Sequence, residues 1–170
     1  MAASRSGIWG WVRALFCLLL FFPVLGVGSQ EAEKQWLVDQ TQADGSLDSP
    51  ASKAITFQST TEATINLLDA DQSLVGDLSG VTSYLASVDA DHSAENLSRS
   101  IRTAYALGQE FGEAQDELLK RQIAGSGFGA FPGYDPDPLS TAYALETLSL
   151  LGITQEPAAY ALQYLINVQN

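Results

Sequence analysis

The sequence predicts an all-α protein that is built as an array of helical hairpins. Three polar turns rich in Gly, Asp and Ser, at 43–47, 89–93 and 125–131, each follow a stretch with helical character. Patterns typical of strands are nearly absent. A layout that returns at intervals of about 40 residues is typical of helical-hairpin repeats. We therefore expect about 3.5 to 4 hairpins after residue 30.

The second helices of these hairpins carry the most specific internal match. Thr61, Thr103 and Thr141 open similar stretches, and Thr-Ala-Tyr-Ala-Leu occurs in full at 103–107 and at 141–145. The spacings between these threonines, about 42 and about 38 residues, lie within the range of helical repeats. We expect the three threonines to occupy equivalent positions in equivalent helices.

The first 29 residues have the three parts of a secretory signal peptide. Arg5 and Arg13 give a positive region, an apolar run follows at 14–27, and the small residues up to Ser29 fit a signal peptidase. An uncleaved membrane anchor is the alternative, but a run of about 14 residues is shorter than the roughly 20 that a spanning helix needs. The sequence therefore predicts cleavage after Ser29 and a secreted, periplasmic or cell-surface protein with no membrane span.

The chain after this segment is acidic and lacks cysteine. The full sequence has 20 acidic and 8 basic residues, and Cys17, Arg5 and Arg13 all precede residue 30. Nucleic acids and anionic membranes repel such a protein, because both are polyanions. With His92 as its single histidine, the chain also lacks the ligands of most transition-metal sites. We expect no cofactor and no nucleic-acid partner.

The helices nearest the carboxyl end are the most clearly delimited. Asp137 and Pro138 suit the N-cap and the first helical position. An apolar stripe then recurs through 140–151, and Gly152 fits a C-terminal cap. A further helix is expected at 158–168, with one apolar face formed by Ala161, Leu162, Leu165, Ile166 and Val168.

Three stretches of this region, 127–131, 137–145 and 164–170, resemble the prenyltransferase and squalene-cyclase repeat. In that family a helix ends in Leu-x-x-x-Gln, a turn with Gly, Asp and an aromatic residue follows, and a second helix opens with Thr. The resemblance covers 30–170 and implies a terpenoid-cyclase-like α/α toroid, in which about six hairpins surround a cavity. By that count 30–170 is a partial toroid. Its apolar flank around Leu165 then needs further repeats downstream or a protein partner to cover it.

No catalytic residue is assigned, and Asp135 and Asp137 are the candidates that the resemblance brings forward. Class II terpene cyclases use an Asp-x-Asp-Asp motif, whose central acid protonates an alkene. Here Pro138 stands at the fourth position, so the supporting carboxylate is missing. The alternative is an N-cap role for Asp137, which is far more common. The zinc site of protein prenyltransferases and the thioester of related proteins need a Cys that the mature chain lacks.

Two Asp-x-Asp pairs begin stretches that resemble the start of a calcium loop: Asp69 with Asp71, and Asp89 with Asp91. Both stretches lack the Gly at the sixth position and the Glu at the twelfth. Asp and Ser are also ordinary turn residues. Calcium binding and a simple turn are therefore both retained as interpretations.

Five aromatic residues are candidates for the wall of a toroid cavity: Tyr105, Tyr143, Phe128, Phe131 and Tyr134. Aromatic faces stabilise cations. Packing in a core is the more common role of aromatic residues at helical spacing and beside turns.

Two functions follow from these patterns. The first is a non-catalytic extracytoplasmic α/α-toroid module, for protein–protein contact or for binding a polymer or an apolar ligand. The second is a terpene-cyclase-like enzyme of the squalene or hopene type, or a fragment of one. The missing acid motif and the export signal favour the module, because cyclases act on isoprenoids that are made inside the cell.

Overall fold

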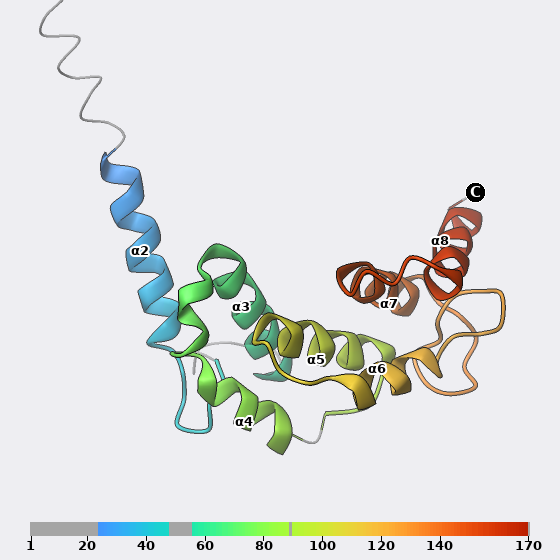
Figure 1. Cartoon of the computed structure of the whole chain (residues 1–170), viewed down its shortest axis with the longest axis horizontal. Coiled ribbons are helices and arrows are strands. Elements are labelled where there is room, and N and C mark those ends of the chain that lie inside the picture. The colour runs from blue at the N-terminus through green and yellow to red at the C-terminus, as the bar shows by residue number, and fades with distance from the viewer. Residues whose placement is uncertain (1–23, 48–55, 89, 170) are drawn as a thin grey trace, which may run out of the picture. The chain divides into compact units, whose positions relative to one another are not determined.

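The structure, a computed structural model, describes residues 24–47, 56–88 and 90–169 (Figure 1). Helices account for most of these residues: α2 (Val24–Val38), α3 (Thr56–Ala70), the 3-10 helix η1 (Gln72–Val75), α4 (Ser79–Ser87), α5 (Ala94–Ala106), α6 (Gly112–Leu119), α7 (Pro138–Leu150) and α8 (Glu156–Val168). Within the described ranges, β pairing is limited to isolated bridges, Thr41 with Leu47 and Gln122 with Phe128. The predicted all-α class is confirmed.

The chain divides into two compact units, residues 1–39 and residues 40–170. In the first unit the described element is α2, which runs across the expected cleavage point after Ser29. Polar side chains one turn apart support this helix. Lys34 Nζ lies 2.9 Å from a carboxylate oxygen of Glu31, and Gln35 donates to Asp39 at 2.9 Å. Such pairs add a few tenths of a kcal/mol each. The other helices form the second unit.

Three helices that alternate along the chain, α3, α5 and α7, lie side by side in the second unit (Figure 1). Four side-chain pairs join them, and the residue numbers rise together on both partners: Gln58–Glu95, Glu62–Arg99, Arg99–Tyr143 and Arg102–Glu146. The three helices therefore run parallel, with their carboxyl ends at the same edge. Of the intervening and following helices, α6 packs on α5 and α8 packs on α7.

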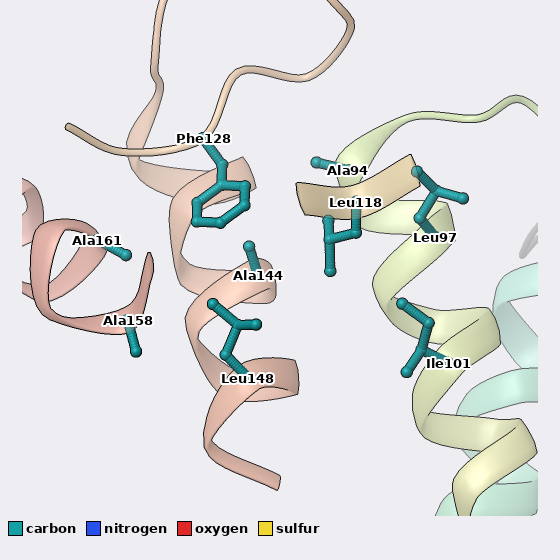
Figure 2. Packing of buried hydrophobic residues seen from close by; sticks show 9 residues of the cluster. All are labelled: Ala94, Leu97, Ile101, Leu118, Phe128, Ala144, Leu148, Ala158 and Ala161. Carbon is teal, nitrogen blue, oxygen red and sulfur yellow. The ribbon is translucent and has the colours of Figure 1, made fainter. Parts of the chain in front are cut away.

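A hydrophobic core fills the space between α5, α6, α7 and α8 (Figure 2). Its fully or almost fully buried members are Ala94, Leu97, Ile101, Leu118, Phe128, Ala144, Leu148, Ala158 and Ala161. Phe128 is the largest, and Figure 2 shows its ring hanging from the preceding turn toward Ala144. Burying such a side chain contributes about 2 to 3 kcal/mol. The alanines on α7 and α8 leave room for those two helices to approach closely.

The turns at 41–47 and 122–128 share one hydrogen-bond pattern. In each, a buried apolar residue donates its backbone N–H to a threonine hydroxyl 13 residues later, Leu47 to Thr60 at 2.9 Å and Phe128 to Thr141 at 2.9 Å. Each hydroxyl donates back to the carbonyl of the same residue, at 3.3 and 3.2 Å. We call this arrangement the threonine clamp. It satisfies both backbone polar groups of one buried residue and ties the turn to the start of the next helix.

The clamp corrects the expected alignment of the threonines. Thr60, and not Thr61, is the counterpart of Thr141, because Thr61 donates inside α3 to the carbonyl of Phe57 at 3.0 Å. Thr103 lies in the last turn of α5 and donates to the Arg99 carbonyl at 2.8 Å. A threonine hydroxyl can bond to its own helix in this way without any turn. The motif Thr-Ala-Tyr-Ala-Leu therefore lies near the carboxyl end of α5 but near the amino end of α7.

The connection between α4 and α5 shows no clamp in its described part. Ser98 is the fifth residue of α5, as Thr60 is of α3, but its Oγ is buried without a hydrogen-bond partner. The start of α5 is held instead by the next turn along the chain. The Ala94 N–H donates to the Ala130 carbonyl at 2.8 Å, and Arg121 donates to the His92 carbonyl at 3.1 Å.

The predicted ends of α7 are confirmed. Asp137 is the N-cap, its carboxylate accepts the Ser140 N–H at 2.8 Å, and Pro138 is the first helical residue. Gly152 follows the helix with a φ of +71°, a backbone conformation that favours glycine.

The single apolar face expected for α8 is wrong. Ala158 and Ala161 are buried, and Figure 2 shows both turned toward α7. Leu162 is 51% exposed and Ile166 is 47% exposed. The apolar residues of α8 therefore divide between a packed face and an exposed flank, because Ala161 and Leu162 are neighbours about 100° apart around the helix.

Candidate functional site

A network of charged side chains centred on Arg99 joins α3, α5 and α7. Arg99 donates to Glu95 of its own helix at 3.1 and 3.0 Å and also donates to Glu62 of α3. It donates to the hydroxyl of Tyr143 on α7 at 2.7 Å, and its guanidinium carbon lies 5.0 Å from the centroid of that ring. Only 9% of the Arg99 side chain is exposed. A buried guanidinium needs such partners, because an unpaired buried charge costs several kcal/mol.

A third ion pair extends the network toward the carboxyl ends of the helices. Arg102 of α5 lies 2.9 Å from a carboxylate oxygen of Glu146 on α7. Glu95, Arg99 and Arg102 are spaced four and three residues apart, so they form one stripe along α5. We call the surface formed by this stripe and its partners on α3 and α7 the α3/α5/α7 face.

A hollow of about 360 Å³ lies at the carboxyl end of this face. Its walls combine charged and apolar side chains: Ile65, Asp69, Arg102, Tyr105, Glu146 and Leu150. We call it the terminal hollow. A cavity of this size with a few polar groups among apolar walls is typical of a small-molecule site.

The α3/α5/α7 face is more suited to cations than to anions. Arg99 and Arg102 are both engaged by carboxylates, so neither guanidinium is free for an anionic ligand. Asp69, in contrast, is an exposed carboxylate at the end of α3. Four carboxylates and two guanidinium groups leave the face with an excess of negative charge: Glu62, Asp69, Glu95 and Glu146 against Arg99 and Arg102.

A second hollow, of about 350 Å³, lies between α4, α5 and α6. Small side chains from all three helices line it, among them Ala86, Ala104 and Ala114, together with Phe111. Space left between small and aromatic side chains accepts an apolar group. This hollow is separate from the charged network.

The catalytic candidates Asp135 and Asp137 lie in the turn before α7. Asp137 has the capping hydrogen bond described above, and Asp135 is exposed. Tyr164 of α8 donates to the Pro136 carbonyl between them at 2.7 Å. The surroundings of both aspartates are thus those of a turn that is fixed by its neighbours.

The calcium candidates lie at separate places. Asp71 is the N-cap of η1 and accepts the Ser73 N–H at 3.0 Å. Asp69 lies in the terminal hollow, and Asp89 lies outside the described residues. Across the described parts of the chain, no three His, Cys, Asp or Glu side chains gather as a metal-binding group would.

Asp91 organises the connection before α5. It accepts the Ser93 N–H at 3.1 Å and the side-chain amide of Asn96 at 2.8 Å. The pKa of Asp91 lies below its ordinary value, and the hydrogen bond from the Ser93 side chain is the largest cause. Hydrogen bonds to a charged carboxylate lower its pKa in this way.

The five aromatic candidates have different surroundings. Phe128 is in the core, and Phe131 packs edge-on against Tyr134 with ring centroids 5.5 Å apart. Tyr143 meets Arg99. Tyr105 lines the terminal hollow and touches Phe111, with centroids 6.2 Å apart. Two of the five, Tyr105 and Tyr143, thus belong to the α3/α5/α7 face.

The sequence patterns did not single out the charged members of this face. Glu95 and Arg99 have the four-residue spacing of a helical ion pair, which was a usable signal. The partners on other helices, Glu62 and Tyr143, are 37 and 44 residues away from Arg99. No local pattern connects residues so far apart.

Most of the predicted export segment, residues 1–23, lies outside the described residues. In the part of the chain that the structure describes, no helix is both long and apolar enough to cross a membrane.

Comparison with known proteins gave no relative. No protein family model, no curated protein and no solved structure matches this chain.

Proposed function

We propose that this chain is an exported, non-catalytic binding module of the α/α-toroid type. Residues 1–29 act as the signal peptide, and residues 30–170 form a partial toroid of the prenyltransferase and squalene-cyclase kind. The module binds a ligand, a polymer or a protein partner through the α3/α5/α7 face.

The observation that carries this proposal is the parallel set of three helices joined by a polar face, on which the carboxylates of Glu62 and Glu146 are partly exposed. α3, α5 and α7 are linked by Arg99 and Arg102, and the terminal hollow opens beside them. Alternate helices that run parallel are the arrangement of the inner layer of stacked hairpins, and such arrays use that surface for binding. The threonine clamp adds support, since the same turn-to-helix arrangement occurs twice, before α3 and before α7.

The exposed flank of α8 is the second contact surface of the proposed module. Leu162, Ile166 and Val168 are exposed there and Leu165 is half-buried. An apolar strip of this kind marks a contact with another protein. Light scattering and dye binding test this proposal. Both are measured on the purified chain and on the Leu162→Glu, Ile166→Glu double variant. We expect self-association or binding of a hydrophobic dye, lost in the variant. A monomer that binds no dye would contradict the role of the flank.

The export step is tested by the mass of the protein recovered outside the cytoplasm. We expect a mature chain that begins at Gln30, because Ser29 suits the signal peptidase. The matched control is the variant Ser29→Pro, which should block cleavage and leave the longer species. An exported protein that retains residues 14–27 would contradict the proposed signal peptide.

The binding step is tested by NMR spectra of the purified full chain with a panel of basic, acidic and neutral peptides and oligosaccharides. Chemical-shift changes should gather on α3, α5 and α7, around Glu62, Arg99 and Tyr143. Changes confined to α6 or to the turn at 122–128 would argue against the face.

The same panel includes squalene and a linear isoprenyl diphosphate. Turnover of either compound, abolished by Asp135→Asn or Asp137→Asn in a chain of unchanged stability, would replace the binding module with a cyclase.

A further inference from the structure

We infer that the terminal hollow binds an organic cation, in the form of an ammonium group that carries an aromatic or aliphatic body. This inference rests on the proposed binding role of the α3/α5/α7 face and names its ligand class.

The charge balance of the hollow selects a cation. Arg102 and Glu146 form an ion pair at 2.9 Å and neutralise each other. Asp69 is left as an exposed carboxylate on the opposite wall, contributed by α3. One uncompensated negative charge matches one ammonium group, whereas a metal ion would need more ligands than this wall offers.

The backbone acts in the same direction. The hollow lies where the parallel helices α3, α5 and α7 end. The carboxyl end of a helix carries a partial negative charge, which stabilises cations within its last turn. Three such ends at one site add to the attraction of Asp69.

The apolar walls account for the body of the ligand. Tyr105 is 47% exposed and Leu150 is 43% exposed, although both line a hollow rather than a flat surface. The Tyr105 ring also contacts Phe111, with ring centroids 6.2 Å apart. A ring held in this way gives an ammonium group a cation–π contact and gives its apolar body a surface to pack on.

The whole chain favours the approach of such a ligand. Its net charge of −12 attracts cations over a distance and raises their rate of association at low salt.

The test uses the purified full chain and three probes of similar shape: 2-phenylethylammonium, 2-phenylethanol and phenylacetate. Calorimetry or NMR titration at low salt should show that the ammonium binds about tenfold more tightly than the alcohol, and that phenylacetate does not bind. Benzyltrimethylammonium serves as a second cationic probe and should also bind.

Three variants locate the site. Asp69→Asn should weaken binding of the ammonium by about tenfold, and Tyr105→Leu by roughly threefold to tenfold. Glu113→Gln is the matched control, because it removes one carboxylate from the exposed surface of α6, away from the hollow. It should leave the affinity unchanged.

Two results would overturn the inference. One is an equal loss of affinity in Asp69→Asn and Glu113→Gln, which would mean that overall charge and not the hollow attracts the probe. The other is the absence of binding by both cationic probes at millimolar concentration. If peptides or oligosaccharides still shift the resonances around Glu62 and Tyr143, the proposed function stands while this ligand class fails. If no compound shifts them, both fail.

Discussion

The turn at 122–128 and the connection between α4 and α5 solve the same problem in different ways. Both must end one helix and start the next beside a buried core. The turn at 122–128 does so by itself, through the clamp between Phe128 and Thr141. The connection before α5 has a local cap, in which Ser93 accepts the Asn96 N–H, but it also uses groups from elsewhere, the Ala130 carbonyl and the Arg121 side chain. Both turns were recognised in the sequence as polar turns, whereas the bonds that tie the connection before α5 to residues 121 and 130 were not.

The largest change in stability is expected for a substitution at Gly127, where the turn at 122–128 lies against side chains of α7 and α8. A Cβ on Gly127 would lie 2.4 Å from Thr141 Oγ1 and 2.7 Å from the Tyr164 ring. Gly127→Ala should therefore cost about 3 kcal/mol or more of unfolding free energy, as overpacking and loss of a buried hydrogen bond combine. Urea denaturation measures it. Gly112→Ala, where nothing lies within 4 Å, is the control and should change stability by less than about 1 kcal/mol.

The clamp hydroxyl should show the next largest effect. Thr141→Val keeps the shape of the side chain but leaves the buried N–H of Phe128 without its partner, while the Phe128 carbonyl keeps only the Asp137 N–H, at 3.1 Å. We expect a loss of about 2 to 3 kcal/mol, and a similar loss for Thr60→Val. Thr103→Val removes only a bond within its own helix and should cost less than about 1 kcal/mol. Equal losses at Thr103 and Thr141 would show that the clamp adds nothing.

The cap of α7 should contribute less than the clamp. Asp137→Ala removes the acceptor of the Ser140 N–H and should cost about 1 kcal/mol. Asp137→Asn should recover most of that loss, because asparagine is also a good N-cap residue. A loss that asparagine does not recover would indicate a role for the negative charge. Thermal unfolding of both variants distinguishes the cases.

The connection before α5 should respond to substitution in the opposite direction. Ser98→Ala removes a buried hydroxyl that has no partner, so we expect a gain in stability of up to about 1 kcal/mol. The same change at the equivalent threonine of a clamp is destabilising. A loss at Ser98 comparable to that at Thr141 would mean that the two connections are built alike.

The smallest effect is a pH dependence of stability that the turn at 41–47 shares with the connection before α5. Hydrogen bonds lower the pKa of two aspartates. The largest cause is the Ser46 backbone N–H for Asp44 and the Ser93 side chain for Asp91. Both aspartates bind protons less readily in the folded chain than their unfolded value of about 3.9 implies. Their contribution to the free energy of unfolding is therefore complete above that pH, and it is lost as the pH falls through the pKa values of the folded chain. When the pH is lowered from 6 to 3, the free energy of unfolding should therefore fall less in the Asp44→Asn, Asp91→Asn double variant than in the unsubstituted chain.

Local chemistry made part of this fold predictable. Asp137, Pro138 and Gly152 delimit α7 in the sequence because caps act within a few residues. The all-α class followed in the same way from periodicity and turns.

Tertiary contacts decided the rest of the fold. The choice of Thr60 over Thr61 depends on which side of α3 meets the turn at 41–47. The pairing of Arg99 with Glu62 joins residues 37 positions apart. The division of α8 between a packed and an exposed face depends on how it is rotated against α7. The site was therefore less predictable than the fold, since its residues gather only when three separate helices align.

The bond between the Ala94 N–H and the Ala130 carbonyl has a consequence for how the chain matures. During synthesis α5 is complete in sequence well before residue 130 has been added, so its first turn waits for a partner that comes later. Until then this tertiary bond cannot form, and the first turn of α5 has only its local cap, in which Ser93 accepts the Asn96 N–H. Residue 130 follows the turn at 122–128 closely, and the clamp residue of that turn, Thr141, comes soon afterwards. The start of α5 therefore gains this contact only after residues that lie beyond α6 have been synthesised.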